Sequence, residues 1–396
     1  MLSAKYLTAI FLIVAAAAAG WFVLGGTLVV RTDQSDTAQR AALAAQWGTA
    51  LEQSQPSFTL QTRHGKSVTD FDLDPASSRI AVDLALDLRR KGLLWYNTYG
   101  VGFTATYGVG IVQRGTLRML FPMPSTTATY DDVSVSVNGR RIETTGANGK
   151  LAAVIPWSPG RPVSVTVHYR TRGLDTWTYR FGTGVVTAHD VKLTMRTNFK
   201  AIDFPAATLA PTAERETPDG WELEWSDRQL VTGAGIGMAF PSPLQPGPLA
   251  QRLTFWAPLS LAFYVFVMLV ITTLRRIDLH PINYLFLAAA FFAFHLLFAY
   301  TVDRIRIEYA FVICSAVSLA LTVSYLRLVV GLRFAAVEAA AAQFFYLILF
   351  SLALFDEGYS GLSITIGAIV TLFVMMQVTG RIRWSERFSP APARAT

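Results

Sequence analysis

The last third of the chain contains five long apolar segments that follow one another with only short polar breaks. Each is close to the ~20 residues that a helix needs to cross ~30 Å of hydrocarbon. A soluble domain cannot bury that much apolar surface in series, so the sequence predicts an integral membrane protein. The predicted spans are residues 253–274, 282–302, 309–326, 334–355 and 362–379.

A sixth apolar segment lies near the beginning of the chain, where residues 6–30 carry no charge between Lys5 and Arg31. A cleaved signal peptide is the alternative interpretation, because the alanines at residues 17–19 resemble a cleavage site. The apolar region of a signal peptide is only about 7–15 residues long, and this segment is longer. We therefore interpret it as an uncleaved transmembrane anchor.

The distribution of charge predicts the topology. Charged residues make up 15 % of the chain, and the formal net charge is +7. The basic residues of the last third lie at the ends of the apolar segments and not along one face, so we predict no nucleic-acid partner. By the positive-inside rule, this pattern places both termini in the cytoplasm and residues 31–250 on the outer side.

The segment between the first two spans has the pattern of an all-β domain. Residues 33–52 predict a stalk helix that Ser35 or Asp36 would cap. Residues 133–137 and 163–169 alternate strictly between apolar and polar, and Asn138-Gly139 is the favoured two-residue hairpin turn. We favour strand over helix for residues 70–91. The pattern predicts an antiparallel, sandwich-like domain, formed either as one sandwich or as two smaller sheets.

These patterns divide the chain into four parts. Residues 1–30 form an N-terminal anchor, residues 31–250 a β-rich domain, residues 251–384 a five-helix transmembrane block, and residues 385–396 a disordered tail. Within the second part, residues 241–248 carry four prolines and predict a stiff linker without regular structure.

Chemistry-bearing motifs are missing from the sequence. None of the five histidines has the spacing of a metal-ligand pair, and the chain contains no G-x-S-x-G or S-x-x-K motif. We therefore expect no metal, no cofactor, no catalytic residue and no enzymatic activity. The only cysteine, Cys314, lies within a predicted span, so the β domain has no disulfide.

Polar residues inside the predicted spans are the better candidates for function, because burying them in lipid is costly unless they have a partner. Within the membrane block the candidates are His280, Asn283, His295, Glu338 and Gln343, and in the outer loops they are Asp303, Glu357 and Tyr359.

Each membrane candidate also has a purely structural interpretation. Glu338 would pair with Arg327 or Arg333 near the cytoplasmic interface. His295 would be a hydrogen-bonded packing residue, Asn283 and Gln343 would join neighbouring helices, and His280 would cap a helix start.

Several short motifs in the membrane block resemble the CreD family of inner-membrane proteins. They are LHPINYL at residues 279–285, FHLL at 294–297, VSY at 323–325, EGY at 357–359 and TGRIRW at 379–384. The order of segments, with an anchor, a large β-rich insert and a five-helix block, is also similar to that family. The resemblance implies a bacterial inner-membrane location and a role in cell-envelope integrity, and it supplies no catalytic residues.

Three functional hypotheses follow. In the first, the helices are embedded in the lipid bilayer and anchor a periplasmic β domain that contacts a periplasmic protein, peptidoglycan or lipid. In the second, the membrane block is a transporter or lipid-handling unit that uses its intramembrane polar residues. In the third, a membrane enzyme would use Glu338 and His280. The sequence does not predict an oligomeric state.

Overall fold

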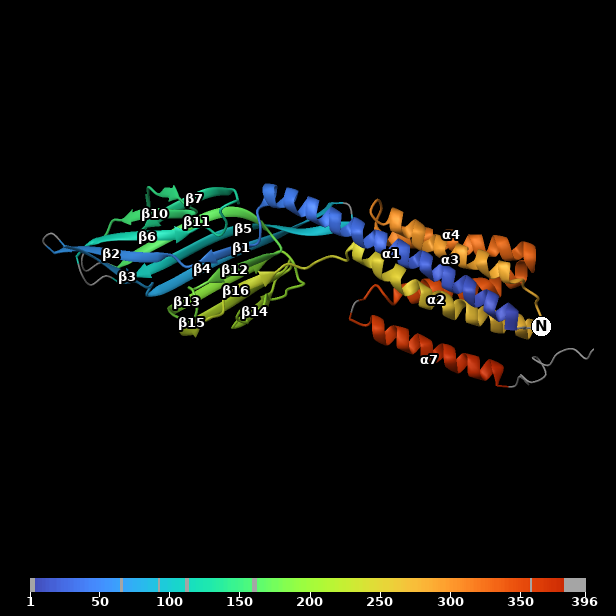
Figure 1. Ribbon diagram of the computed structural model, residues 1–396. Helices are drawn as coiled ribbons and strands as arrows, with labels where there is room; N and C mark the ends of the chain where they lie inside the picture. The colour runs from blue at the N-terminus through green and yellow to red at the C-terminus, as the bar shows by residue number, and fades with distance from the viewer. Residues whose placement is uncertain are drawn as a thin grey trace, which may run out of the picture. The chain divides into compact units, whose positions relative to one another are not determined.

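The chain folds into two compact units (Figure 1). The computed structural model describes residues 4–64, 67–91, 93–110, 114–158, 162–356 and 358–380. The membrane unit comprises Met1–Asp36, Gly92–Leu94 and Leu244–Thr396, and the β unit comprises Thr37–Lys91 and Trp95–Pro243. The tail that we predict to be disordered, residues 385–396, lies outside the described residues.

Among the described residues, 6 helices are long and apolar enough to cross a membrane, which confirms the predicted anchor and the five-helix block. Their apolar side chains suit lipid, and helical hydrogen bonding satisfies the backbone where no water is present. The helices are α1 (Ala4–Trp47), α2 (Pro246–Arg275), α3 (Pro281–Thr301), α4 (Ile307–Val329), the span Phe334–Leu352 and α7 (Ser360–Thr379).

The span Phe334–Leu352, which we name the π-rich helix, alternates between π-helical and α-helical turns. In its π segments the backbone closes wider rings: Ala340 N–H donates to Ala335 O, and Phe350 N–H donates to Phe345 O. Such turns are rare and are frequent at functional sites. The alanine-rich sequence predicts only a plain helix. The segments are η1 (Phe334–Ala339), α5 (Ala340–Gln343), η2 (Phe344–Leu349) and α6 (Phe350–Leu352).

The predicted helix over residues 33–52 is confirmed as far as Trp47, but the prediction that it starts at a cap of its own is wrong. Helix α1 continues without a break through Ser35 and Asp36, which are therefore interior residues and not caps. The polar stretch after Arg31 contains no glycine or proline, so nothing in it ends the helix. The helix ends instead just before Gly48, which has φ +85 and whose N–H donates to Ala44 O at 2.9 Å.

The prediction that residues 241–248 lack regular structure is also wrong for residues 246–248. Helix α2 begins at Pro246, and Gln245 takes the extended N-cap conformation. Backbone N–H groups in the first helical turn have no acceptor within the helix. A proline there loses no hydrogen bond, so Pro246 and Pro248 are compatible with the helix. Helix α3 begins in the same way at Pro281.

The tip of one β-hairpin belongs to the membrane unit. Leu93 at this tip is 2 % exposed, and its carbonyl accepts from Gly247 N–H at 3.0 Å. A Cβ at Gly247 would lie 2.7 Å from Thr32 Oγ1 and 3.2 Å from Leu93 Cβ. Only glycine therefore fits at this position without a shift of its neighbours.

The β unit contains three sheets. Their strand orders are β14-β15-β13-β4-β5-β11-β7-β8, β3-β2-β6-β10-β9 and β1-β12-β16 (Figure 1). The strands are β1 (Leu51–Ser54), β2 (Ser57–His64), β3 (Ser67–Leu73), β4 (Ser77–Lys91), β5 (Leu94–Val109), β6 (Thr116–Pro122), β7 (Tyr130–Val137), β8 (Arg140–Ile142), β9 (Thr145–Ala147), β10 (Lys150–Ile155), β11 (Val163–Leu174), β12 (Thr176–Arg180), β13 (Val186–Thr197), β14 (Ala213–Glu216), β15 (Trp221–Thr232) and β16 (Ile236–Ala239).

The strands follow the predicted pattern closely, and the predicted β-rich class is confirmed. Residues 70–73 and 77–91 are strand, with a break at 74–76, and Asn138 and Gly139 have φ values of 47 and 82, as the predicted hairpin turn requires. Pairing is mostly antiparallel, but β4 pairs with β13 and β1 pairs with β12 in parallel. Two of the three sheets are therefore mixed, a feature that alternation along a single strand does not indicate.

One continuous core holds the three sheets together. Phe121 of β6 packs edge-on against Tyr169 of β11, which belongs to another sheet, at 6.3 Å, and Phe103 of β5, from the same sheet as Tyr169, stacks on Tyr169 at 4.9 Å. The Tyr169 hydroxyl donates to Gln53 Oε1 of β1 at 2.7 Å. Buried side chains of all three sheets thus form one core.

Candidate functional site in the membrane unit

Two of the predicted membrane candidates have structural partners at the ends of helices. His280 is the N-cap of α3, and its Nδ1 accepts from Ile282 N–H at 3.3 Å. Asn283 is 8 % exposed, and its Oδ1 accepts from the Tyr325 hydroxyl of α4 at 2.8 Å. The first contact orders a helix start and the second joins two helices, as their structural interpretations predict.

His295 is enclosed by aromatic rings. It is 3 % exposed, and its Nδ1 lies 3.3 Å from Phe291 O on its own helix. Its ring lies 5.7 Å from that of Trp21 on α1 and 4.9 Å from that of Phe294. This apolar cage packs α1 against α3.

Gln343 belongs to a hydrogen-bonded chain that joins three helices. Gln343 Nε2 donates to Ser318 Oγ at 2.7 Å, and Ser318 Oγ donates to Ala290 O at 2.6 Å. Both side chains are 0 % exposed. Gln343 Oε1 is buried and has no hydrogen-bond partner among the described residues. The chain connects α3, α4 and the π-rich helix.

Glu338 does not pair with Arg327 or Arg333, so that prediction is wrong. Its Oε1 accepts from Nη2 of Arg275 at the end of α2. Spacing along the sequence favours Arg333, but the packing of α2 against the π-rich helix makes Arg275 the neighbour. Glu338 Oε2 is buried and has no hydrogen-bond partner among the described residues.

The five membrane candidates therefore lie in separate contacts. Among the described residues no hydrogen bond or ion pair joins any two of them, and no group of three or more potential metal ligands is present. The arrangement provides no continuous polar pathway between them.

The candidate residues of the outer loops differ in their contacts and exposure. Asp303 accepts from Arg31 Nη2 at 2.5 Å, and Arg31 also donates to Ala299 O at 3.2 Å. Arg31 is thus a partner that the sequence did not identify, although it stands at the end of the first span. Tyr359 is 65 % exposed. Glu357 lies outside the described residues.

The only cysteine of the chain is buried in the membrane unit. Cys314 is 0 % exposed, and its Sγ lies 3.6 Å from the Thr301 hydroxyl. It therefore packs as a small apolar residue.

A groove lies between α2, the π-rich helix and α7. Figure 1 shows helix α7 alongside α2. The volume of the groove is about 820 Å³, within the ~300–1,000 Å³ typical of ligand sites. Sequence reasoning missed this groove because its lining is apolar, like any lipid-facing helix surface. The lining includes Phe263, Val267 and Ile271 of α2, Phe345 and Leu349 of the π-rich helix, and Ile364, Val370 and Val374 of α7.

The polar residues that line the groove are Arg275 and Glu338, Tyr346 and Thr371, and Ser363. Arg275 and Glu338 both line it and are paired with each other. Farther along, the Tyr346 hydroxyl lies 2.9 Å from Thr371 Oγ1 and connects the π-rich helix to α7. A Cβ at Gly367, which also lines the groove, would meet no atom within 4 Å. The groove is therefore open in front of this glycine.

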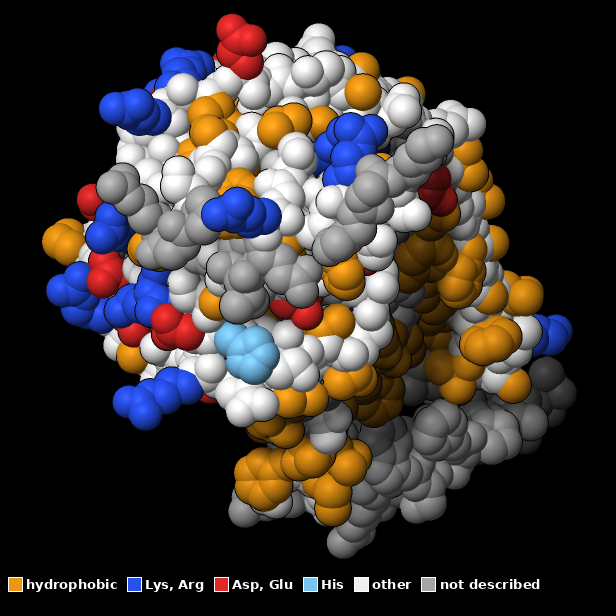
Figure 2. Space-filling model, turned by 90° about the vertical axis from the view of Figure 1, so that its left-hand side faces the viewer, with side chains coloured by type: hydrophobic (Ala, Val, Ile, Leu, Met, Phe, Trp, Pro, Cys, Tyr) orange, Lys and Arg blue, Asp and Glu red, His pale blue; other side chains and the backbone are white. Residues whose placement is uncertain are grey.

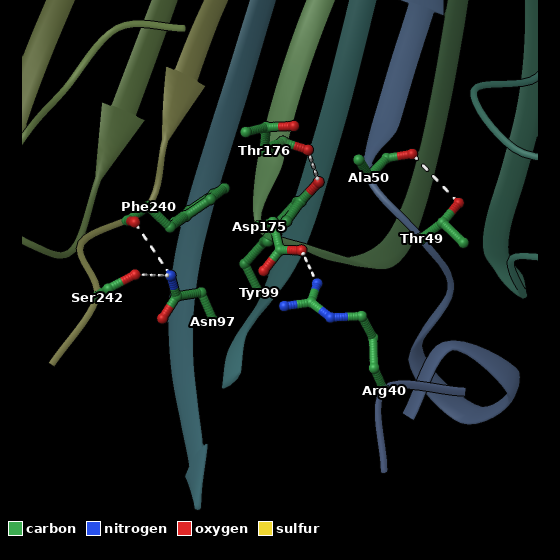
Figure 3. Close-up of polar contacts among 9 residues, drawn as sticks. All are labelled: Arg40, Thr49, Ala50, Asn97, Tyr99, Asp175, Thr176, Phe240 and Ser242. Carbon is green, nitrogen blue, oxygen red and sulfur yellow. Dashed lines mark hydrogen bonds and ion pairs between the residues drawn. The ribbon is translucent and has the colours of Figure 1, made fainter. Parts of the chain in front are cut away.

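The β unit has its own cluster of polar contacts where α1 and β16 end (Figure 3). Arg40 of α1 pairs with Asp175 at 2.6 Å. Asn97 Nδ2 donates to Phe240 O at 3.1 Å, and the ring of Phe240 stacks on Tyr99 at 4.0 Å. These contacts fasten the end of the helix and the exit of the chain to the sheets.

Exposed charge on the β unit is distributed in ion pairs. Figure 2 shows Lys and Arg interspersed with Asp and Glu on the face that it presents. Glu222 accepts from Arg196 at 2.9 Å and from Arg215 at 2.7 Å. The hydrogen bond from Arg196 lowers the pKa of Glu222. Exposed pairs of this kind add little stability.

Comparison with solved structures gives only distant similarities. A Legionella pneumophila protein described as a candidate nutrient binding protein shares 13 % identity, with a TM-score of 0.35 over 62 % of this chain and 84 % of that chain. A mutant M1 zinc metallopeptidase from Deinococcus radiodurans shares 16 % identity, with a TM-score of 0.24 over 42 % of each chain. Leukotriene A4 hydrolase from Saccharomyces cerevisiae shares 10 % identity, with a TM-score of 0.27 over 49 % of this chain and 35 % of that chain. Scores this low identify neither a shared fold nor a shared activity.

Comparison by sequence finds a family match over part of the chain. No curated protein matches the chain. The family model described as Inner membrane protein CreD matches residues 196–385, which contain every motif that carries the resemblance. Over that part, the match confirms the predicted resemblance to the CreD family, and with the 6 helices among the described residues that are long and apolar enough to cross a membrane it supports a multi-pass inner membrane protein.

Proposed function

We propose that the protein supports cell-envelope integrity without catalysing a reaction. The membrane unit anchors the β unit in the periplasm, where the β unit contacts an envelope partner: a protein, peptidoglycan or lipid. Both termini lie in the cytoplasm, because the basic ends of the spans then face inward.

The observation that carries this proposal is the separation of the membrane candidates. His280, Asn283, His295 and Gln343 each bond to a nearby backbone or side chain of the helix bundle. Such contacts hold helices together in lipid. A membrane block of this kind suits an anchor, and the large β unit is then the part that has surface available for a partner.

The firm attachment of the β unit to its own chain ends supports the same proposal. Arg40 and Asp175 fasten α1, while Asn97 and Tyr99 fasten the chain exit at Phe240. These contacts hold both chain ends of the β unit against its own sheets, which suits a domain that binds a partner.

The test is envelope permeability in a strain that lacks the gene and carries one of three versions of the protein. These are the intact chain, a version without residues 31–245, and a His295→Ala/Glu338→Ala double variant. We expect the double variant to restore the barrier and the shortened version to fail. Loss of rescue with the double variant alone, at normal protein levels, would contradict the anchor role.

The groove favours a second candidate function, lipid handling by the membrane unit. An apolar groove about 820 Å³ in volume between membrane-spanning helices suits an acyl chain better than an ion or a polar solute. A Gly367→Phe variant, which would fill the groove, tests this role in the same strain. Unchanged barrier function in that variant would exclude it.

A further inference from the structure

We propose that the groove between α2, the π-rich helix and α7 binds a phosphatidylethanolamine molecule. One acyl chain lies along the groove, Arg275 binds the phosphate, and Glu338 accepts a hydrogen bond from the ammonium group. The inference rests on the lipid-handling candidate function and names the ligand of that site.

The lining of the groove fits an acyl chain. Along the π-rich helix the lining residues extend from Val337 to Ala353, or ~24 Å at about 1.5 Å per residue. This exceeds one leaflet, since the whole hydrocarbon core is ~30 Å thick. Beyond the Arg275–Glu338 end, the remaining polar groups are few, and Tyr346 and Thr371 bond to each other. A long apolar ligand therefore needs no further polar partner there.

Lipid is the occupant because of where the groove lies. All three walls of the groove are helices that can span a membrane. In the apolar segment Ser360–Gln377 of α7, only 6 % of the residues are buried within the protein. In a bilayer, acyl chains are the apolar molecules that surround such a helix. The groove is also open at Gly367, where a Cβ would meet no atom within 4 Å.

The charged end of the groove matches a zwitterionic headgroup. Arg275 is 62 % exposed along its side chain, and its pair with Glu338 involves Nη2. A guanidinium group carries five N–H donors and binds phosphate well. Its other donors can therefore bind a phosphate while the ion pair remains intact.

Glu338 supplies the complementary half of the site. Its Oε2 is buried without a hydrogen-bond partner among the described residues, which is costly for a carboxylate oxygen. An ammonium N–H placed against this oxygen would satisfy it. A quaternary choline group has no N–H to donate. Recognition therefore distinguishes ethanolamine from choline, although both headgroups carry the same net charge.

The test is retention of lipid by the full-length protein in detergent, measured by native mass spectrometry. The probes are phosphatidylethanolamine, phosphatidylcholine and diacylglycerol with identical acyl chains. We expect one retained phosphatidylethanolamine, with retention at least about tenfold above that of the other two lipids, because a charge-assisted hydrogen bond contributes ~1.5–3 kcal/mol. Soluble glycerophosphoethanolamine, which has the headgroup and no chains, should not compete.

Substitutions separate the three parts of the site. Gly367→Phe should abolish retention, whereas Gly361→Phe should not, because a Cβ at Gly361 also meets no atom within 4 Å but this residue does not line the groove. Arg275→Gln should reduce retention about tenfold, with Arg276→Gln as its control. Glu338→Gln should abolish the difference between ethanolamine and choline lipids.

Several outcomes would overturn the inference. They are equal effects of the two glycine variants, equal retention of the ethanolamine and choline lipids by the unaltered protein, or a second protein chain in place of a lipid. A Cβ at Gly367 would meet no atom within 4 Å, and the thermal stability of Gly367→Phe in detergent checks that the fold is intact. If lipid is retained but Gly367→Phe still restores the envelope barrier, the site stands and the lipid-handling function fails.

Discussion

Ser318 is the residue on which the packing of three membrane helices depends. Its hydroxyl accepts from Gln343 and donates to Ala290 O, and it is 0 % exposed. One small side chain thus provides an acceptor and a donor to two different helices. Lipid offers no substitute partner for either group.

Replacing Ser318 with alanine removes both bonds of this residue. Interhelical hydrogen bonds in membranes contribute ~0.6 to ~1.7 kcal/mol, so we expect the free energy of unfolding to fall by about 1 kcal/mol. The measurement is unfolding of the purified protein by titration with sodium dodecyl sulfate. Ser324→Ala is the control, because the Ser324 hydroxyl is exposed and bonds to Leu321 O of its own helix. Equal stability of the two variants would mean that the chain through Ser318 adds nothing.

The sequence identifies which membrane residues are polar but not their partners. His280 as a helix cap and Asn283 as a link between helices follow from their positions in the pattern. The partner of Glu338 does not, because Arg275 lies far from it in sequence and becomes a neighbour only through helix packing. The groove could not be predicted from the sequence either. Its walls are apolar like any lipid-facing helix surface, and only the packing of the helices leaves a space between them.

At the scale of elements, the β7–β8 hairpin depends on one backbone conformation. Gly139 has φ +82, and a Cβ there would meet no atom within 4 Å. A substitution at this site is therefore costly for conformational reasons and not for steric ones.

We expect Gly139→Ala to destabilise the β unit by about 1 kcal/mol, because alanine rarely adopts positive φ. The measurement is thermal unfolding of the full-length protein, followed by circular dichroism in the strand region. Gly100→Ala is the matched control, since Gly100 lies in β5, also has open space at Cβ and has no positive φ. A control variant that loses as much stability would contradict the role of the turn conformation.

Buried tyrosines make the sheets sensitive to alkali. Burial raises the pKa of Tyr99, Tyr107, Tyr169 and Tyr179 above the ordinary value. The unfolded chain releases these protons near pH ~10, whereas the folded chain retains them. Stability is therefore independent of these groups below that pH and falls as the pH rises above it.

We expect phenolate absorbance of the buried tyrosines to appear only together with loss of the strand signal in circular dichroism. Tyr107→Phe should make the decline in stability above pH ~10 less steep, because one fewer proton is released on unfolding. Phenolate absorbance from these residues before any unfolding would contradict the assignment.

Strand alternation predicts the β elements well, because each strand has one buried face. The alternation of β11, with Val163, Val165, Val167 and Tyr169 each at most 2 % exposed, is visible in the sequence. The parallel pairs and the π turns are not visible in the sequence, because they depend on contacts between segments that are distant in the chain. The continuity of α1 was missed because polar residues inside a helix resemble a helix cap.

At the scale of the whole molecule, the orientation in the membrane is the prediction that most constrains function. Val68 of β3 is 51 % exposed, and Arg276 ends α2 in the left-handed conformation. In a variant with Cys314→Ala, a cysteine at residue 68 should react with a membrane-impermeant maleimide in spheroplasts. A cysteine at residue 276 should react only after permeabilisation. The reverse pattern would invert the proposed topology.

The burial of Cys314 has a further consequence for how the protein matures in the cell. The β unit contains no thiol, and the one thiol of the chain is enclosed in the membrane unit. Folding of the β unit therefore needs no thiol oxidase or disulfide isomerase and does not respond to the redox poise of its surroundings. The domain should reach the same folded yield in cells that lack their disulfide-forming enzymes, and reducing agents should leave it intact.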